Sequence, residues 1–149
     1  MILGDLHDQI SSSEAIKFYD NAILLDPENP EVLHAKAFHL QNHDKIQDAL
    51  AMYRKINLIS PQYGPAYSNA GILYMELDSL EKAFEQFNIL AQNEPQNPVA
   101  YYYRAQTLLF QGDVDNAKTD LGNALNLDPD YLEANELLKE IIASEQNNG

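Results

Sequence analysis

The stretch Ala83-Phe84-Glu85-Gln86-Phe87, followed by Pro95, decides the fold because its pattern recurs along the chain at one fixed interval. The alanine of this pattern recurs at Ala15, Ala49, Ala83 and Ala117. Four residues after each comes a large apolar or aromatic side chain: Tyr19, Tyr53, Phe87 and Leu121. Twelve residues after each comes a proline: Pro27, Pro61, Pro95 and Pro129. A spacing of four places two side chains on one helix face, and proline ends a helix, so the pattern predicts near-copies of one helical unit.

The unit over residues 64–97 shows the pattern most completely. Its first helix carries Tyr67, Ala70, Gly71 and Tyr74 in a fixed order. Gly71 indicates a close crossing of two helices, where a side chain would have no room. The neighbouring units have only a methyl group at the equivalent position: Ala37 and Ala105.

A 34-residue period with A-x3-F…P and a segment close to W-x2-L-G-x2-Y resembles the tetratricopeptide repeat family. Tyr67 stands in place of the tryptophan and Ala70 in place of the leucine. The resemblance covers residues 1 to about 143. It implies an all-α fold, a right-handed α-solenoid of stacked antiparallel helix pairs with a C-terminal capping helix, and recognition of another polypeptide as the class of function.

The repeat register divides residues 1–144, expected to form a single repeat domain, into successive units. The expected bounds are a partial repeat over about 1–29, full repeats over 30–63, 64–97 and 98–131, a capping helix over 131–144, and a frayed tail over 145–149.

Local signals predict where helices begin and end. Asparagine followed by proline marks two starts, at Asn29-Pro30 and Asn97-Pro98. Capping boxes predict two more, Ser11 with Glu14 and Asp78 with Glu81, with the helix after Ser11 running over about 14–25. Gly112 is expected to end a helix in the left-handed conformation. Apolar side chains expected at helical spacing within helices are Leu3 and Leu6 in the partial repeat, and Leu138, Ile141 and Ile142 facing inward in the capping helix.

Charge limits the class of partner. The 149 residues include 23 acidic and 9 basic ones, a formal net charge of −14. This balance argues against nucleic acid and anionic membranes, which require basic residues, and favours neutral or cationic protein partners. No signal peptide is visible and no apolar run is long enough to span a bilayer, so we expect a cytoplasmic protein.

Motifs for catalysis are missing from the sequence. There is no G-x-S-x-G, P-loop or H-E-x-x-H segment, and no cysteine. We therefore expect no enzymatic activity and no cofactor. His39 and His43 lie four residues apart beside Asp44, a spacing that can chelate a metal, but two histidines leave a tetrahedral site half empty, so no metal site is predicted.

The resemblance implies where a partner binds, because in this family the first helix of each pair lines the concave face. Residues there that the repeat itself does not need form the candidate peptide-binding groove. Carried onto this sequence, they are His34, Phe38, Asn42, Asn69, Ile72, Met75, Tyr102, Tyr103, Gln106 and Phe110. The alternative is that the terminal helix, or a second copy of the chain, covers some of these side chains.

One subgroup of the family, the co-chaperones, holds the C-terminal carboxylate of heat-shock chaperones with a clamp of lysines, asparagines and an arginine. Asn69 matches one asparagine of that clamp. His34 and Phe38 replace a lysine and an asparagine, and Val99 and Tyr103 replace a lysine and the arginine. The sequence therefore argues against a chaperone tail as ligand.

Two functions follow from the sequence as hypotheses. The first is a non-catalytic adaptor that binds a peptide or a helix of a partner protein in its concave groove. The alternative is a structural scaffold, either a homodimer or a segment of a longer repeat array.

Overall fold

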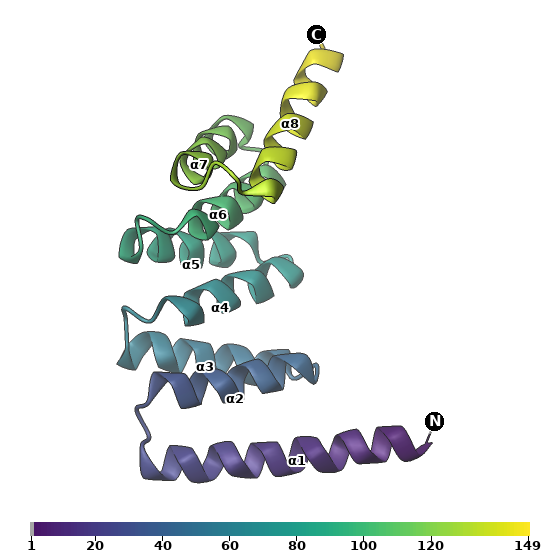
Figure 1. Cartoon of the computed structure of the whole chain (residues 1–149), viewed down its shortest axis with the longest axis vertical. Coiled ribbons are helices and arrows are strands. Elements are labelled where there is room, and N and C mark those ends of the chain that lie inside the picture. The colour runs from purple at the N-terminus through teal and green to yellow at the C-terminus, as the bar shows by residue number, and fades with distance from the viewer. Residues whose placement is uncertain (1) are drawn as a thin grey trace. The chain divides into compact units, whose positions relative to one another are not determined.

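The fold is all-α, as expected. The structure is a computed structural model that describes residues 2–149, with side chains from residue 11 onward, so the expected positions of the Leu3 and Leu6 side chains lie outside the described residues. Within residues 2–149 there are eight helices and no strand (Figure 1). They are α1 (Ile2–Leu25), α2 (Pro30–Asn42), α3 (Ile46–Ile59), α4 (Gly64–Glu76), α5 (Leu80–Asn93), α6 (Pro98–Phe110), α7 (Val114–Leu127) and α8 (Leu132–Asn147).

The helices follow the repeat period of the sequence. The leading helices α2, α4 and α6 begin one period apart, at residues 30, 64 and 98, and the trailing helices α3, α5 and α7 begin at residues 46, 80 and 114. An all-α helical-repeat fold is the result. No helix in the described part of the chain has both the length and the apolar character needed to cross a membrane.

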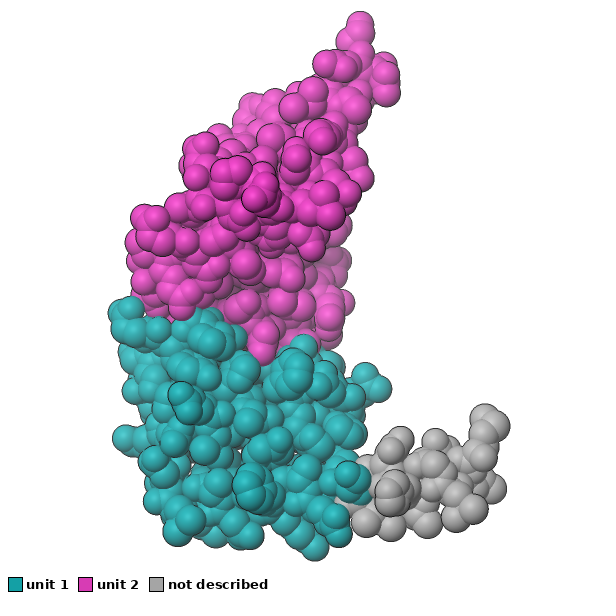
Figure 2. Space-filling model, viewed as in Figure 1, with its two compact units in different colours: residues 1–66 teal, residues 67–149 magenta. Residues whose placement is uncertain are grey.

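The chain divides into two compact units, residues 1–66 and residues 67–149 (Figure 2). In the first unit, α2 packs against α1 and α3. In the second, α6 packs against α5 and α7, and α7 packs against α8.

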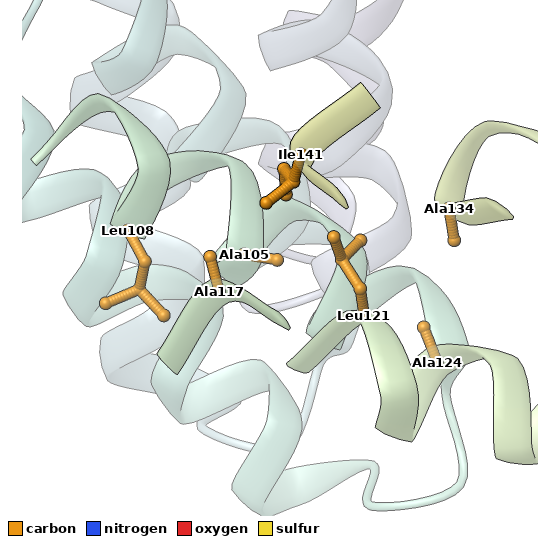
Figure 3. Packing of buried hydrophobic residues seen from close by; sticks show 7 residues of the cluster. All are labelled: Ala105, Leu108, Ala117, Leu121, Ala124, Ala134 and Ile141. Atoms are coloured by element: carbon orange, nitrogen blue, oxygen red, sulfur yellow. The ribbon is translucent and has the colours of Figure 1, made fainter. Parts of the chain in front are cut away.

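Small residues let the helices of the second unit approach closely. Its buried cluster (Figure 3) consists of Ala105, Leu108, Ala117, Leu121, Ala124, Ala134 and Ile141. Alanine is present on each of the three helices α6, α7 and α8, and Leu121 fills the space between them. The repeated alanine of the sequence pattern is a packing residue, since Ala49, Ala83 and Ala117 are all fully buried.

Gly71 confirms the close crossing that the sequence indicates. A Cβ atom placed on Gly71 would lie 2.5 Å from the ζ carbon of the Phe87 ring. Phe87 is fully buried, and its ring is stacked on that of Tyr103 with centroids 5.3 Å apart. The ring therefore has no room to withdraw from a new methyl group.

Two glycine-to-alanine variants should change stability in opposite directions. We expect Gly71→Ala to lower the free energy of unfolding by about 2 kcal/mol, because the added methyl group overpacks the Phe87 site. Gly122, in α7, has no atom within 4 Å of an added Cβ. Gly122→Ala should therefore raise stability by about 0.5–1 kcal/mol through helix propensity alone. Urea denaturation followed by circular dichroism measures both, and a stabilising Gly71→Ala would contradict the packing.

The turns inside the helix pairs share one left-handed residue. Positive φ angles occur at Asp44 (59°), Asp78 (55°) and Gly112 (83°), which are equivalent positions of successive repeats. In each turn the following amide donates back to a carbonyl five residues earlier, as from Ser79 to Tyr74 at 2.8 Å. This is the Schellman arrangement that ends a helix. The expectation for Gly112 is confirmed.

Two predicted capping boxes are wrong. Asp78 lies in the left-handed turn, and the N-cap of α5 is Ser79, which makes no side-chain capping bond. No helix begins after Ser11, since α1 continues without a break from Ile2 to Leu25. Serine tolerates a helix interior when tertiary packing favours it, so the local signal was overridden.

Of the remaining predictions, the two asparagine caps are confirmed and the inward position of Ile142 is wrong. Asn29 and Asn97 are the N-caps of α2 and α6, with side-chain oxygens that accept backbone amides. In α8 Ile141 is buried, but Ile142 is 42 % exposed and does not face inward as expected. A helix turns by about 100° between neighbouring residues, so one face cannot bury both isoleucines fully.

Candidate functional site

Helix α6 carries four of the candidate groove residues. Tyr102, Tyr103 and Gln106 are partly buried, whereas Phe110, the last residue of the helix, is 68 % exposed. The structure brings the first three together: the Tyr102 and Tyr103 rings meet edge to face with centroids 5.3 Å apart, and Gln106 Nε2 donates to the Tyr102 hydroxyl at 2.9 Å. The helix thus presents an ordered aromatic and amide surface.

Tyr103 also has a structural role. Its ring stacks on the buried Phe87 ring of α5, with an interplanar angle of 13°. One face of Tyr103 is therefore used in packing, and only the rest of the side chain is open to a partner. A truncation at Tyr103 would disturb the fold together with any binding.

Tyr131, which sequence reasoning missed as a site residue, joins this surface. It is the N-cap residue of α8, and its ring lies 5.1 Å from that of Tyr102. The sequence contained a signal for this role, because a tyrosine, Tyr63, also stands at the equivalent position two repeats earlier. Tyr63 makes the same contact with His34, the residue equivalent to Tyr102, at a centroid distance of 5.7 Å. Such a tyrosine packs against the first turn of the preceding leading helix.

Burial raises the pKa of two tyrosines of this surface, Tyr102 and Tyr131. It is the largest cause of a raised pKa at Tyr102, and the nearby Tyr103 and Glu133 add to it. Burial also raises the pKa of Tyr131. Both phenols stay protonated near neutral pH and can therefore donate hydrogen bonds.

Helix α4 holds three more candidates in the second unit, and all are partly buried: Asn69, Ile72 and Met75. Their neighbours Ala70, Leu73 and Tyr74 are buried in the core. The candidates therefore lie to one side of the packing face, which leaves part of each side chain accessible.

The first unit holds the three candidates of α2. His34 is half-buried, with its ring 5.6 Å from that of Tyr53 and stacked on Phe38 at 6.5 Å. Burial lowers the pKa of His34, opposed by a hydrogen bond to the backbone of Pro65. Phe38 and Asn42 are exposed. His34 thus belongs mainly to the packing, and Phe38 is the accessible apolar group.

His39 and His43 lie close together, with ring centroids 4.2 Å apart. Their ring nitrogens have protein partners: His39 Nε2 bonds to Ser12 Oγ at 3.0 Å, and His43 Nδ1 to the His39 carbonyl at 2.8 Å. Within the described residues no third histidine, cysteine or carboxylate completes a cluster that could hold a metal ion.

A buried ion pair supports α6 from the side of α7. Arg104 donates from Nε and Nη2 to the two carboxylate oxygens of Asp120, both at 2.7 Å, and from Nη1 to Asn88 at 2.8 Å. Its guanidinium also lies 5.5 Å from the Tyr101 ring centroid. These bonds connect α5, α6 and α7, so they fix the helix that carries the aromatic surface.

Comparison with known proteins agrees with this architecture. The family model for the tetratricopeptide repeat matches residues 98–131. Human tetratricopeptide repeat protein 13 is 26 % identical over 129 residues, which is 87 % of this chain and 15 % of that protein. The chain therefore spans about 15 % of the length of the curated relative that it matches.

Solved structures show the same fold. The crystal structure of MamA matches with a TM-score of 0.82 and 17 % identity, over 94 % of this chain and 82 % of that one. The first repeat domain of Spaghetti (RPAP3), bound to the HSP90 peptide SRMEEVD, matches with a TM-score of 0.75 and 22 % identity, over 81 % of this chain and 96 % of that one. Fold and repeated geometry define an all-α helical-repeat protein. Together with the sequence matches, they support a protein of the tetratricopeptide repeat family.

Proposed function

We propose that the chain is a non-catalytic interaction module that binds a peptide or a helix of a partner protein along its leading helices. The observation that carries this proposal is the surface of α6, where Tyr102, Gln106 and Phe110 follow one another at four-residue spacing and end in an exposed phenylalanine. A solved relative of the same fold has a peptide bound, which supports the class of ligand. That residues 1–144 act as one repeat domain is part of the proposal.

The α6 surface has the chemistry to hold a peptide. Three side chains at four-residue spacing cover about 12 Å of helix, the length of three or four extended residues. Gln106 uses its amide nitrogen on Tyr102, so its carbonyl oxygen faces a ligand as an acceptor. Because the ion pair of Arg104 and the core already fix α6, the ordering cost of binding falls on the peptide.

Charge selects among peptides. With a net charge of −14, the chain repels acidic segments and attracts neutral or basic ones. Val99 and Tyr103 occupy the places of two basic clamp residues of the co-chaperones, so α6 offers a carboxylate no cation at these two places, and its Arg104 is paired with Asp120. The proposed ligand is therefore not an acidic chaperone tail but a neutral or basic segment.

Truncating the exposed end of the surface should abolish binding without unfolding the chain. In affinity capture from the source cell, we expect Gln106→Ala combined with Phe110→Ala to lose the partner that the wild type retains. Leu58→Ala is the control, because Leu58 is an exposed apolar residue (82 %) that lies on the trailing helix α3. Circular dichroism should show unchanged helicity in both variants. Equal capture by all three proteins would contradict the proposal.

A scaffold role is the second candidate, and exposed apolar residues at the end of α1 favour it. Phe18, Leu24 and Leu25 are all largely exposed there. Exposed apolar residues that lie close together in the sequence of one helix are typical of a protein–protein association site. Light scattering over a dilution series tests the homodimer. If the measured molar mass stays at the mass of one chain at every concentration, the chain does not form a homodimer.

A further inference from the structure

An apolar pocket lies in the last repeat, at the end of α6, the start of α7 and the second half of α8. Its volume is about 600 Å³. Leu109, Val114, Leu137 and Ile141 form its apolar wall, and each of the three helices contributes to that wall. All of these residues belong to the second unit, so the pocket is a feature of one compact body.

Smaller side chains line this pocket than stand at the equivalent positions one repeat earlier. In the repeat register Leu137 is the equivalent of Tyr103, and Ser144 is the equivalent of Phe110. Val114 likewise takes the place of Leu80. The pocket thus has aliphatic and small side chains where the preceding repeat has two aromatic rings.

The same repeat gains negative charge at the pocket. Glu140 and Glu145 line it at positions where the preceding repeat has the neutral residues Gln106 and Gln111. Glu145 is paired with Lys118 at 2.7 Å. Glu140 is exposed and has no ion pair or hydrogen bond within residues 11–149. An unpaired carboxylate beside an apolar wall suits a ligand that brings a cation with its apolar side chain.

We propose that this pocket anchors a leucine- or phenylalanine-sized side chain of a peptide whose neighbouring residues are lysine or arginine. The proposal rests on the proposed function and names the chemistry of its ligand. The apolar anchor packs against the apolar wall of the pocket, and a basic neighbour pairs with Glu140. A second copy of this chain fits less well, since its own charge of −14 would be repelled.

Three labelled hexapeptides test both parts of this chemistry by fluorescence anisotropy with the full chain. The probes are Lys-Lys-Phe-Leu-Lys-Lys, Glu-Glu-Phe-Leu-Glu-Glu and Lys-Lys-Ser-Asn-Lys-Lys. We expect the first to bind with saturation and the other two to bind at least about tenfold more weakly, a difference equivalent to about 1.4 kcal/mol. Binding of the first should weaken as salt is raised, because exposed charges are screened.

Two variants locate the binding. Ser144 lines the pocket, so Ser144→Phe places a ring there and should weaken binding of the first peptide about tenfold or more. Ser144→Ala, the matched control, should bind as the wild type does. Glu140→Gln keeps the shape of the side chain and should weaken both the binding of the first peptide and its salt dependence.

The outcomes decide the proposal separately from the function. Equal binding of the Ser-Asn peptide, equal binding of the acidic peptide, or an unchanged affinity in Ser144→Phe would each overturn it. None of these results touches the Phe110 capture experiment, which changes only α6. If the Gln106→Ala, Phe110→Ala variant loses the partner but the hexapeptides do not bind as expected, the interaction module is supported and this pocket is not part of its binding site.

Discussion

Phe87→Ala is expected to lower the free energy of unfolding by about 3–5 kcal/mol, the range for removing a fully buried aromatic ring. The Phe87 side chain is completely buried, and it occupies the space that Gly71 leaves open on α4. It also supports Tyr103 through a stacked contact at 5.3 Å. The variant therefore creates a cavity and at the same time removes the support of Tyr103, one residue of the candidate groove.

The measurement is urea denaturation monitored by circular dichroism, with Phe110→Ala as the control. Each variant loses one phenyl ring. Because Phe110 is exposed, the loss of its ring should change stability by no more than about 0.5 kcal/mol. A Phe87→Ala variant as stable as the control would show that α4 and α5 do not pack through this ring.

Asp120→Ala is expected to cost about 3 kcal/mol, because it leaves the Arg104 guanidinium charged and largely buried without its carboxylate. The pair is bidentate at 2.7 Å, and the Asp120 side chain is only 6 % exposed. Asn88 alone cannot balance the charge. Thermal and urea unfolding should both show the loss.

An apolar replacement separates charge burial from helix packing. Arg104→Met combined with Asp120→Leu should recover most of the lost stability, since a matched apolar pair carries no desolvation penalty. Asp20→Ala removes the more exposed pair with Lys36 and should change stability by no more than about 1 kcal/mol. If Asp120→Ala matched Asp20→Ala, the ion pair would have no role in holding α6.

Much of the fold could be predicted from the sequence because one packing solution is repeated. Gly71 is the clearest example: its lack of a side chain indicated a close crossing, and the Phe87 ring fills that space. Asn29 and Asn97 likewise indicated helix starts through their side-chain oxygens. These signals succeed because the residue and its structural cause are neighbours in the sequence or in the register.

Other features depend on tertiary contacts that a local signal cannot report. Ser11 fits a capping box, yet α1 continues through it. Asp78 resembles an N-cap, but it adopts φ of 55° to close the turn before α5. In both cases a polar residue suits two conformations, and packing of the whole helix pair chooses between them.

The candidate site was predictable only in outline. The leading helices follow from the register, whereas the position of Tyr131 against Tyr102 depends on where α8 starts and how its first turn packs. The use of Tyr103 as a support for Phe87 was hidden for the same reason. Which candidate residues take part in binding stays a prediction.

The most direct test of the account is a nuclear magnetic resonance titration of the ¹⁵N-labelled chain with the peptide that the captured partner supplies. The account predicts that the largest amide shift changes fall on the leading helices of the second unit, at Met75, Gln106 and Phe110 and their neighbours. Changes concentrated instead on the trailing helices α5 and α7 would contradict it, because the binding surface would then lie on the opposite member of each helix pair.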